Sequence, residues 1–179
     1  MSLHDHFTLM ASYNQWMNAK LYDAADKLSA AELLADKGAF FGSVFGTLNH
    51  LCVADRIWLQ RFAKHPAQSA LLEPIVALQR PTILNEMLFD HLTAMRAHRN
   101  WLDEIIVRWI AALSEDDLSQ PLTYANTKGV VSTKGFAHLL THFFNHQTHH
   151  RGQTTTTLLS QAGIDVGVTD LLMVIPNED

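Results

Sequence analysis

Four long segments of this 179-residue chain carry apolar residues at alternating spacings of three and four. That spacing places the apolar side chains on one face of an α-helix, which must then pack against other helices. The segments cover residues 3–28, 43–62, 82–113 and 133–161, and a proline-containing connection, residues 64–81, separates the second from the third. The pattern predicts an all-α fold, a four-helix bundle with one long crossover loop.

Local signals indicate where these segments begin and end. Ser43 and Thr82 are good N-caps for the second and third helices. Residues 29–32 and 114–117 have the capping-box pattern, which predicts two additional short helical turns. Residues 122–131 lose the helical period around a turn-forming stretch, so we expect a small β-hairpin before the last helix. We expect that helix to stop at Gly163, and the apolar tail, residues 171–175, to pack back on the bundle.

Composition limits the class of protein. Apolar residues make up 47% of the chain and charged residues 17%, with a net charge of −5, which indicates one folded domain over residues 1–179. No basic run exists that could follow a phosphate backbone, so we expect no nucleic-acid partner. We also expect no signal peptide and no membrane span. The single Cys52 cannot form an internal disulfide, which favours the cytoplasm.

Histidine is concentrated in the last long helix, where four of the eleven histidines fall within residues 142–150. His146 and His150 are four residues apart, so both imidazoles can reach one metal ion from the same helix face. The spacing equally allows the pairs His142/His146 and His138/His142. A histidine-rich helix without a metal is the alternative, because short motifs also occur by chance.

Two common metal chemistries do not fit these residues. No Glu-x-x-His pair is present, which disfavours a carboxylate-bridged di-iron centre. The string His146-Gln147-Thr148-His149-His150 has Gln where zinc proteases have their catalytic Glu. An all-histidine mononuclear site remains, in which the last helix supplies two nitrogens and another helix a third. Such a site accepts Zn, Ni, Cu or Fe ions and leaves a position open for water or substrate.

Two stretches of the sequence resemble the DinB/YfiT-like family of metal-binding four-helix bundles. The first is Leu48-Asn-His-Leu51 with Trp58, and the second is residues 145–153, Asn-His-Gln-Thr-His-His-Arg-Gly-Gln. The opening helix, residues 13–18, is also similar. The resemblance implies a divalent ion, Ni or Zn and less often Fe, held by His50, His146 and His150. It further implies a homodimer and, in some relatives, S-transfer or isomerisation with a low-molecular-weight thiol.

Several polar residues on the apolar stripes need separate explanations. Asn14 interrupts the first stripe, and we expect it to make structural hydrogen bonds. Asp55 could accept from an imidazole N–H or pair with a neighbouring arginine. His91 and His98 lie too far apart to share an ion, so structural or supporting roles are expected. Arg151 and Gln153 are candidates for anion or supporting contacts or for helix packing. The expected partner of Arg151 is a carboxylate, either in this chain or on the substrate.

Two functions fit these expectations. One is a metal-dependent enzyme, a thiol transferase or a hydrolase, acting on a small-molecule substrate. The other is a non-catalytic metal-binding stress or interaction protein. A metal face that opens into a pocket would favour the enzyme, and a closed site with a fourth protein ligand, such as His91 or His98, would favour the structural role. A redox bundle is disfavoured because the carboxylates are missing.

Overall fold

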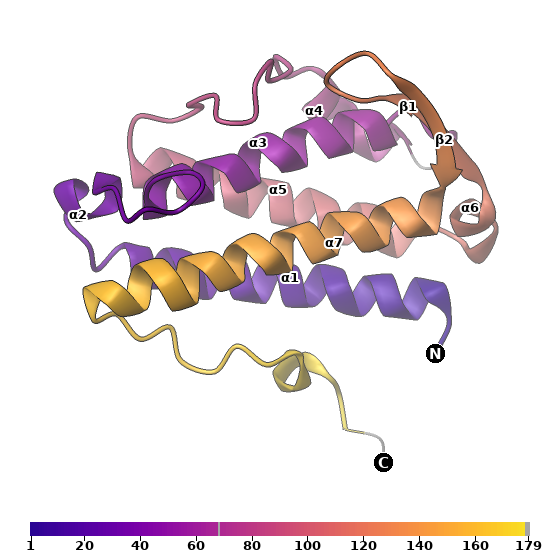
Figure 1. Cartoon of the computed structure of the whole chain (residues 1–179). Coiled ribbons are helices and arrows are strands. Elements are labelled where there is room, and N and C mark those ends of the chain that lie inside the picture. The colour runs from indigo at the N-terminus through magenta and orange to yellow at the C-terminus, as the bar shows by residue number, and fades with distance from the viewer. Residues whose placement is uncertain (68, 178–179) are drawn as a thin grey trace.

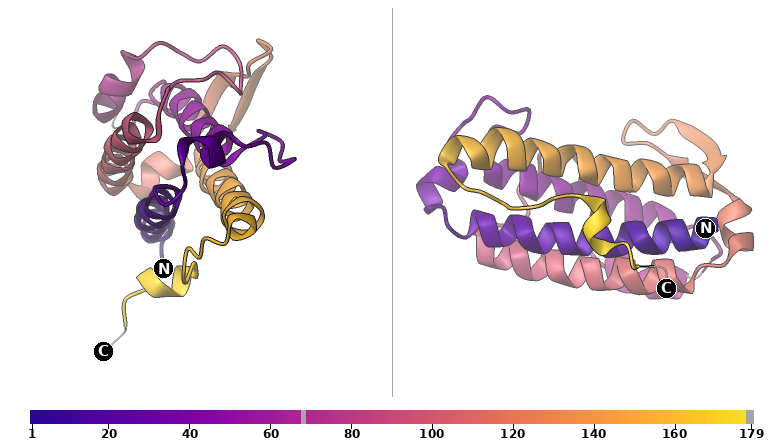
Figure 2. Two further views of the ribbon diagram at one scale, coloured as in Figure 1. Left: turned by 90° about the vertical axis from the view of Figure 1, so that its left-hand side faces the viewer. Right: turned by 90° about the horizontal axis from the view of Figure 1, so that it is seen from below.

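The computed structural model describes residues 1–67 and 69–177 and is built mainly of helices (Figure 1). Its four long helices are α1 (Leu3–Ala25), α3 (Val44–Phe62), α5 (Leu92–Ala112) and α7 (Phe136–Gly152). α1 contacts α5 and α7, and α3 contacts the same two helices. The four therefore form the predicted bundle, which Figure 2 shows along and across its axis. Within the described residues, every helix is too short or too polar to cross a membrane.

Side-chain caps begin the helices much as the sequence predicts. Ser43 Oγ accepts from the amide of Gly46 at the start of α3. Capping boxes at residues 29–32 and 114–117 open the short helices α2 (Ala30–Leu34) and α6 (Glu115–Ser119). These caps satisfy amides that have no partner inside the helix, which is why the pattern is readable from sequence.

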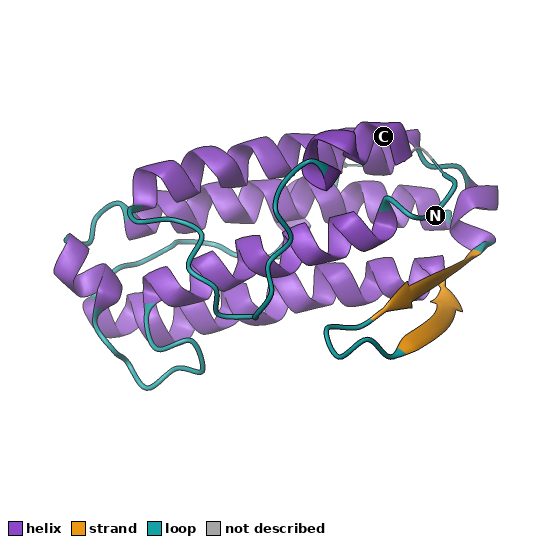
Figure 3. Cartoon of the chain, turned by 90° about the horizontal axis from the view of Figure 1, so that it is seen from above, coloured by secondary structure: helices purple, strands orange, loops and turns teal. Residues whose placement is uncertain are grey.

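The crossover is longer than predicted, because α5 begins at Leu92 and not near Thr82. The connection contains η1 (Ser69–Leu72) and α4 (Glu73–Val76), then continues as irregular chain to His91 (Figure 3). Asn49 of α3 holds this irregular chain: its Nδ2 donates to the carbonyl of Glu86, and its Oδ1 accepts from the amide of Leu88. These tertiary hydrogen bonds replace the helical bonds that the apolar spacing of Leu84 and Leu88 suggested.

The hairpin and the last helix also differ from the prediction at their boundaries. β1 (Pro121–Ala125) pairs antiparallel with β2 (Val131–Gly135), so the chain is still extended at residue 133, where helix was expected. After α7 the helical path continues as a π-helix, η2 (Gln153–Leu159), and a short 3-10 turn, η3 (Ser160–Ala162). Gly163 then ends the path in the left-handed conformation, with φ 74°.

The tail only partly matches the expectation of packing on the bundle. Its turn η4 (Leu171–Val174) contacts α1, and the Tyr13 hydroxyl donates to the carbonyl of Thr169 at 2.7 Å. Figure 2 shows this tail running back beneath the bundle. Leu172 nevertheless remains 73% exposed, so the segment rests on the surface without entering the core.

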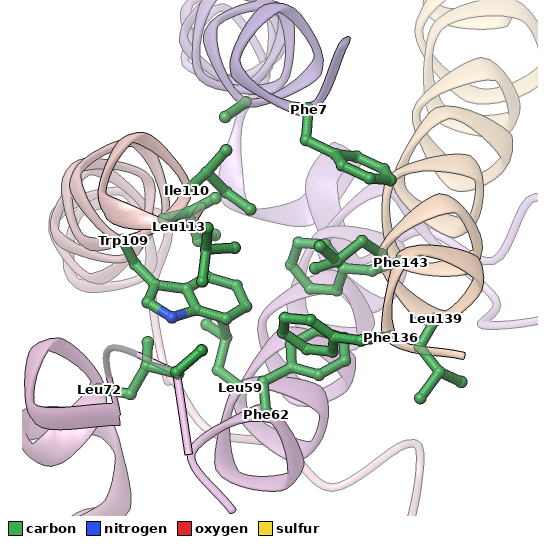
Figure 4. Close-up of a cluster of buried hydrophobic side chains, with 14 of the residues drawn as sticks. Phe7, Leu59, Phe62, Leu72, Trp109, Ile110, Leu113, Phe136, Leu139 and Phe143 are labelled. Carbon is green, nitrogen blue, oxygen red and sulfur yellow. The ribbon is translucent and has the colours of Figure 1, made fainter. Parts of the chain in front are cut away.

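Two apolar clusters fill the bundle, one toward each end. The cluster at the hairpin end is aromatic, with Phe62 stacked on Trp109 and packed edge-on to Phe136 and Phe143 (Figure 4). The cluster at the opposite end is mainly aliphatic and includes Leu21, Leu48, Leu51 and Met95. Between the two clusters, all four long helices contribute buried polar residues, and the histidine cluster lies at that level.

Candidate metal site

Three histidines converge between α3 and α7, as the family resemblance implied. His50 comes from α3, and His146 and His150 come from α7. One ring nitrogen from each lies within 4.8 Å of the other two. The Nε2 atoms of His50 and His146 are 3.3 Å apart. Within the described part of the chain, these three residues form the one cluster of histidine, cysteine or carboxylate side chains with this ligand spacing.

Hydrogen bonds at the opposite ring nitrogens orient two of the imidazoles. His50 Nδ1 donates to the carbonyl of Leu84 at 2.8 Å, and His150 Nδ1 donates to Gln153 Oε1 at 2.8 Å. A proton on Nδ1 leaves the Nε2 lone pair free to bind a cation. Both rings therefore present Nε2 as the ligand atom. The sequence could not predict that the Leu84 carbonyl accepts from His50, because this carbonyl lies on the irregular chain of the crossover.

The surroundings keep the cluster uncharged at neutral pH. Burial lowers the pKa of His50 to about 4 and that of His146 to about 3. Burial also lowers the pKa of His150, against the opposing effect of its hydrogen bond to Gln153. Neutral imidazoles are the form that binds metals, so protons compete little with an ion at pH 7.

An aromatic lid covers one side of the cluster. The Phe41 ring stacks on His50 with ring centroids 3.7 Å apart, and meets His150 edge-on at 5.6 Å. Phe41 lies in the loop between α2 and α3, whose backbone passes against the first turn of α3 at Gly46. A side chain at residue 46 would overlap this backbone, so glycine there allows the lid to approach.

The other side of the cluster opens into a cavity of about 520 Å³ between α3 and α7. Its wall includes all three histidines, the α3 residues Ala54, Ile57, Trp58 and Arg61, and residues 126–127 at the hairpin tip. The sequence interpretation did not include Arg61 or Ile57 in the site. Helical spacing could have indicated both residues, because residues 54, 57, 58 and 61 share one helical face with His50.

A buried polar layer supports the cluster from behind. Arg99 of α5 donates to Asp55 of α3 and to both oxygens of Asp103. Gln147, next to His146 on α7, donates its amide to Asp55. Thus Asp55 binds neither an imidazole nor a neighbouring arginine of its own helix, contrary to both expectations. Its partners come from other helices, which the local sequence cannot indicate.

The same layer accounts for Asn14 and Arg151. Asn14 donates to Asp103 and accepts from Arg151, so its role is structural as expected. The Arg151 guanidinium also lies 5.5 Å from the Tyr13 ring centroid and donates to Thr148. No carboxylate among the described residues pairs directly with Arg151, so the carboxylate partner expected within the chain is wrong, and a carboxylate on a substrate stays a prediction. Arg151 packs α7 against α1, whereas Gln153 makes the supporting contact to His150.

The remaining histidines lie outside the cluster. His142 packs edge-on against Trp58 further along the cavity, and His149 accepts from Gln153. His138 lies against Gly135 at the start of α7. His91 is the exposed N-cap of α5, and His98 accepts from Arg56 beside Trp101. The roles of His91 and His98 are structural, and neither approaches the cluster as a fourth ligand.

The donor set fits a divalent transition-metal ion. Two nitrogens bound at about 2.0–2.1 Å in a tetrahedral arrangement lie roughly 3.3 Å apart, which matches the His50–His146 separation of 3.3 Å. Three neutral imidazoles, two of them with lone pairs fixed by hydrogen bonds, suit zinc, nickel, copper or iron. The cavity would leave further coordination positions accessible to small molecules.

Comparisons with known proteins agree with this picture. The family model described as the DinB family matches residues 1–178. A curated relative, Protein DinB of Bacillus subtilis (strain 168), is 25% identical over 163 residues, which cover 88% of this chain and 87% of that protein. No solved structure matches the chain.

Proposed function

The chain belongs to the DinB family, and on that premise we propose that it binds one divalent transition-metal ion through His50, His146 and His150. The observation that carries the proposal is the convergence of three ring nitrogens within 4.8 Å of one another. The hydrogen bonds to Leu84 and Gln153 support it, because they hold two imidazoles in the tautomer that binds cations. We propose Zn or Ni as the ion, with Fe as the next candidate, because the family resemblance implies these ions and neutral imidazole binds all three.

We propose further that the site belongs to an enzyme acting on a small molecule, by thiol-dependent S-transfer or by hydrolysis. The cavity of about 520 Å³ beside the histidines is in the size range of small-molecule sites. A bound divalent ion would supply Lewis acidity and lower the pKa of a water or thiol that reaches it. The residues of the chain would orient that ligand, with Phe41 restricting access from one side.

The second candidate is a metal-binding protein without turnover. A buried structural site usually has four protein ligands. In the part of the chain that the structure describes, the cluster has three, and the fourth side faces the cavity. This arrangement favours the enzyme over the structural alternative.

Elemental analysis of the purified protein tests the metal proposal directly. We expect about one Zn or Ni ion per chain, removed by a strong chelator and restored by titration with the same ion. Absence of stoichiometric metal after reconstitution would refute it. A screen of thiol cofactors with electrophilic partners, run on the reconstituted protein, then separates the transferase from the hydrolase and from the non-catalytic alternative.

Two broader expectations remain proposals. We propose a homodimer in the cytoplasm, the dimer supported by apolar side chains exposed on the tail and on α1, including Leu172, Met173 and Leu3. Light scattering on a sizing column should then give twice the chain mass of 20.1 kDa. Cys52 is buried and forms no disulfide within the described residues, which is compatible with a reducing compartment.

A further inference from the structure

Arg61 is a buried cation in the wall of the cavity, and no carboxylate in the part of the chain that the structure describes balances its charge. The residue is only 6% exposed, and its Nε has no hydrogen-bond partner within the described chain. Among residues 1–67 and 69–177, no carboxylate oxygen lies within ion-pair distance of it. Burying an ionised group without a partner is costly, so such groups are normally paired.

The neighbours of Arg61 are aromatic or positively charged. Its guanidinium lies 4.6 Å from the Trp58 ring centroid and 5.3 Å from that of Tyr124. These rings fix the position of the guanidinium through cation–π contact but do not neutralise it. Burial and the nearby Arg80 both lower the pKa of Arg61, and Arg61 in turn lowers the pKa of His142. The local field would therefore attract an anion.

Arg61 and the histidine cluster lie at opposite ends of one groove. On α3, Arg61 follows His50 by eleven residues, which corresponds to roughly 16 Å along the helix axis. Ala54, Ile57 and Trp58 line the cavity between these two ends. The α3 wall of the groove thus has an apolar middle, with His142 of α7 beside Trp58, a cation at one end and the three clustered imidazoles at the other.

We propose that Arg61 binds the terminal carboxylate of an elongated small-molecule substrate whose apolar middle lies along Ala54, Ile57 and Trp58. The reacting end of that substrate would reach the histidine cluster. This inference rests on the proposed function for the reacting end, whereas the carboxylate subsite stands on Arg61 alone. The substrate class is a monocarboxylate with an apolar segment of several carbon atoms.

A carboxylate fits better than a phosphate. The planar guanidinium binds a carboxylate through two parallel hydrogen bonds, with one negative charge to balance one positive charge. A phosphate monoester brings up to two charges, and Arg61 is the only arginine or lysine that lines the described cavity. The apolar middle also disfavours a compact, highly charged ligand.

Calorimetric titration with octanoate, and with 1-octanol as the uncharged probe, tests the subsite. We expect Arg61→Gln to weaken octanoate binding roughly 10- to 100-fold and to leave octanol binding unchanged. Arg61→Lys should give an intermediate loss of octanoate affinity, because lysine keeps the positive charge but lacks the two parallel N–H donors of the guanidinium. Arg108→Gln, which removes an exposed arginine of α5, is the matched control and should bind octanoate as the wild type does.

His146→Ala separates this inference from the metal proposal, because octanoate could also bind a metal ion. If Arg61 is the subsite, His146→Ala loses the metal and retains octanoate affinity, and Arg61→Gln retains the metal and loses octanoate affinity. Octanoate affinity that disappears with His146 and survives in Arg61→Gln would overturn the inference, as would a wild-type protein that does not bind octanoate. Circular dichroism of each variant confirms folding, and Arg61→Lys keeps the test decisive if Arg61→Gln does not fold.

Discussion

The Nε2 atom of His50 lies 3.3 Å from the Nε2 atom of His146, although 96 residues separate them in the chain. His50 stands on α3 and His146 on α7, two adjacent helices of the bundle. Two lone pairs at this distance repel each other unless a proton or a cation lies between them. A divalent cation bound by both nitrogens would remove that repulsion.

The histidines of α7 should differ sharply in their importance for metal binding. We expect His146→Ala to abolish stoichiometric metal binding, because it removes one of three converging nitrogens. His149→Ala is the matched control, and it should leave the stoichiometry unchanged since His149 bonds only to Gln153. Elemental analysis of both variants measures the difference, and an equal loss in the two would contradict the assignment.

The hydrogen bond from His150 to Gln153 should contribute to metal affinity. Gln153→Leu removes the acceptor that holds the proton on Nδ1, and loss of such a supporting contact typically costs about 10- to 100-fold in affinity. Competition titration with a chromogenic chelator gives the affinity. Gln161→Leu, an exposed glutamine beyond the π-helix, should match the wild type. Unchanged affinity in Gln153→Leu would show that the tautomer is fixed by other means.

Two helical glycines should respond oppositely to alanine. A Cβ at Gly46 would overlap the Phe41 carbonyl oxygen, whereas a Cβ at Gly152 would have open space around it. We expect Gly46→Ala to destabilise the fold by about 1–3 kcal/mol and to displace the Phe41 lid. Gly152→Ala should stabilise it by about 0.4–1 kcal/mol. Urea unfolding measures both, and a neutral Gly46→Ala would mean that the lid loop moves freely.

Removing Asp55 should damage the buried polar layer severely. Asp55→Ala leaves the Arg99 charge without one of its two carboxylates in a buried setting, which costs about 3–5 kcal/mol in comparable cases. Asp23→Ala breaks the pair with Arg96 at the surface, where Asp23 is 63% exposed, and should cost less than about 1 kcal/mol. Chemical denaturation of both variants provides the comparison. Similar losses of stability in the two variants would indicate that water reaches the polar layer around Asp55.

His98 should make the metal-free protein less stable in mild acid. Burial and the guanidinium groups of Arg56 and Arg99 lower its folded-state pKa to about 4, from about 6.5 in the unfolded chain. Between these values the unfolded chain binds more protons than the folded one, so stability falls as pH decreases from 6.5 to 4. His98→Gln cannot take up that proton, so its stability should fall less over this window. Unfolding curves at several pH values, with chelator present, check the difference, which would be absent if His98 were solvated.

Periodicity along the chain determined the four long helices and their capped starts. These features are local: a stripe of apolar residues and a serine at the cap act within one or two turns. The same reasoning misplaced the start of the third helix, because Asn49, on another helix, holds residues 86–88 as irregular chain. Helical hydrogen bonds within the segment compete with hydrogen bonds to another helix, and this competition decided the conformation of the segment. Only the helical hydrogen bonds can be predicted from the local sequence.

For the candidate site, too, some features follow from the sequence and others only from the tertiary structure. By itself the sequence established that a histidine pair on the last helix could bind a metal and that di-iron and zinc-protease chemistry do not fit. Spacing left three histidine pairs open, and resemblance to a family selected one. The same resemblance named His50 as the third ligand. Only the tertiary structure showed His50 beside that pair, placed Leu84 behind its ring, and put Arg61 in the cavity without a carboxylate partner among the described residues. These relationships depend on how α3 and α7 pack, which involves distances across the chain that no local pattern encodes.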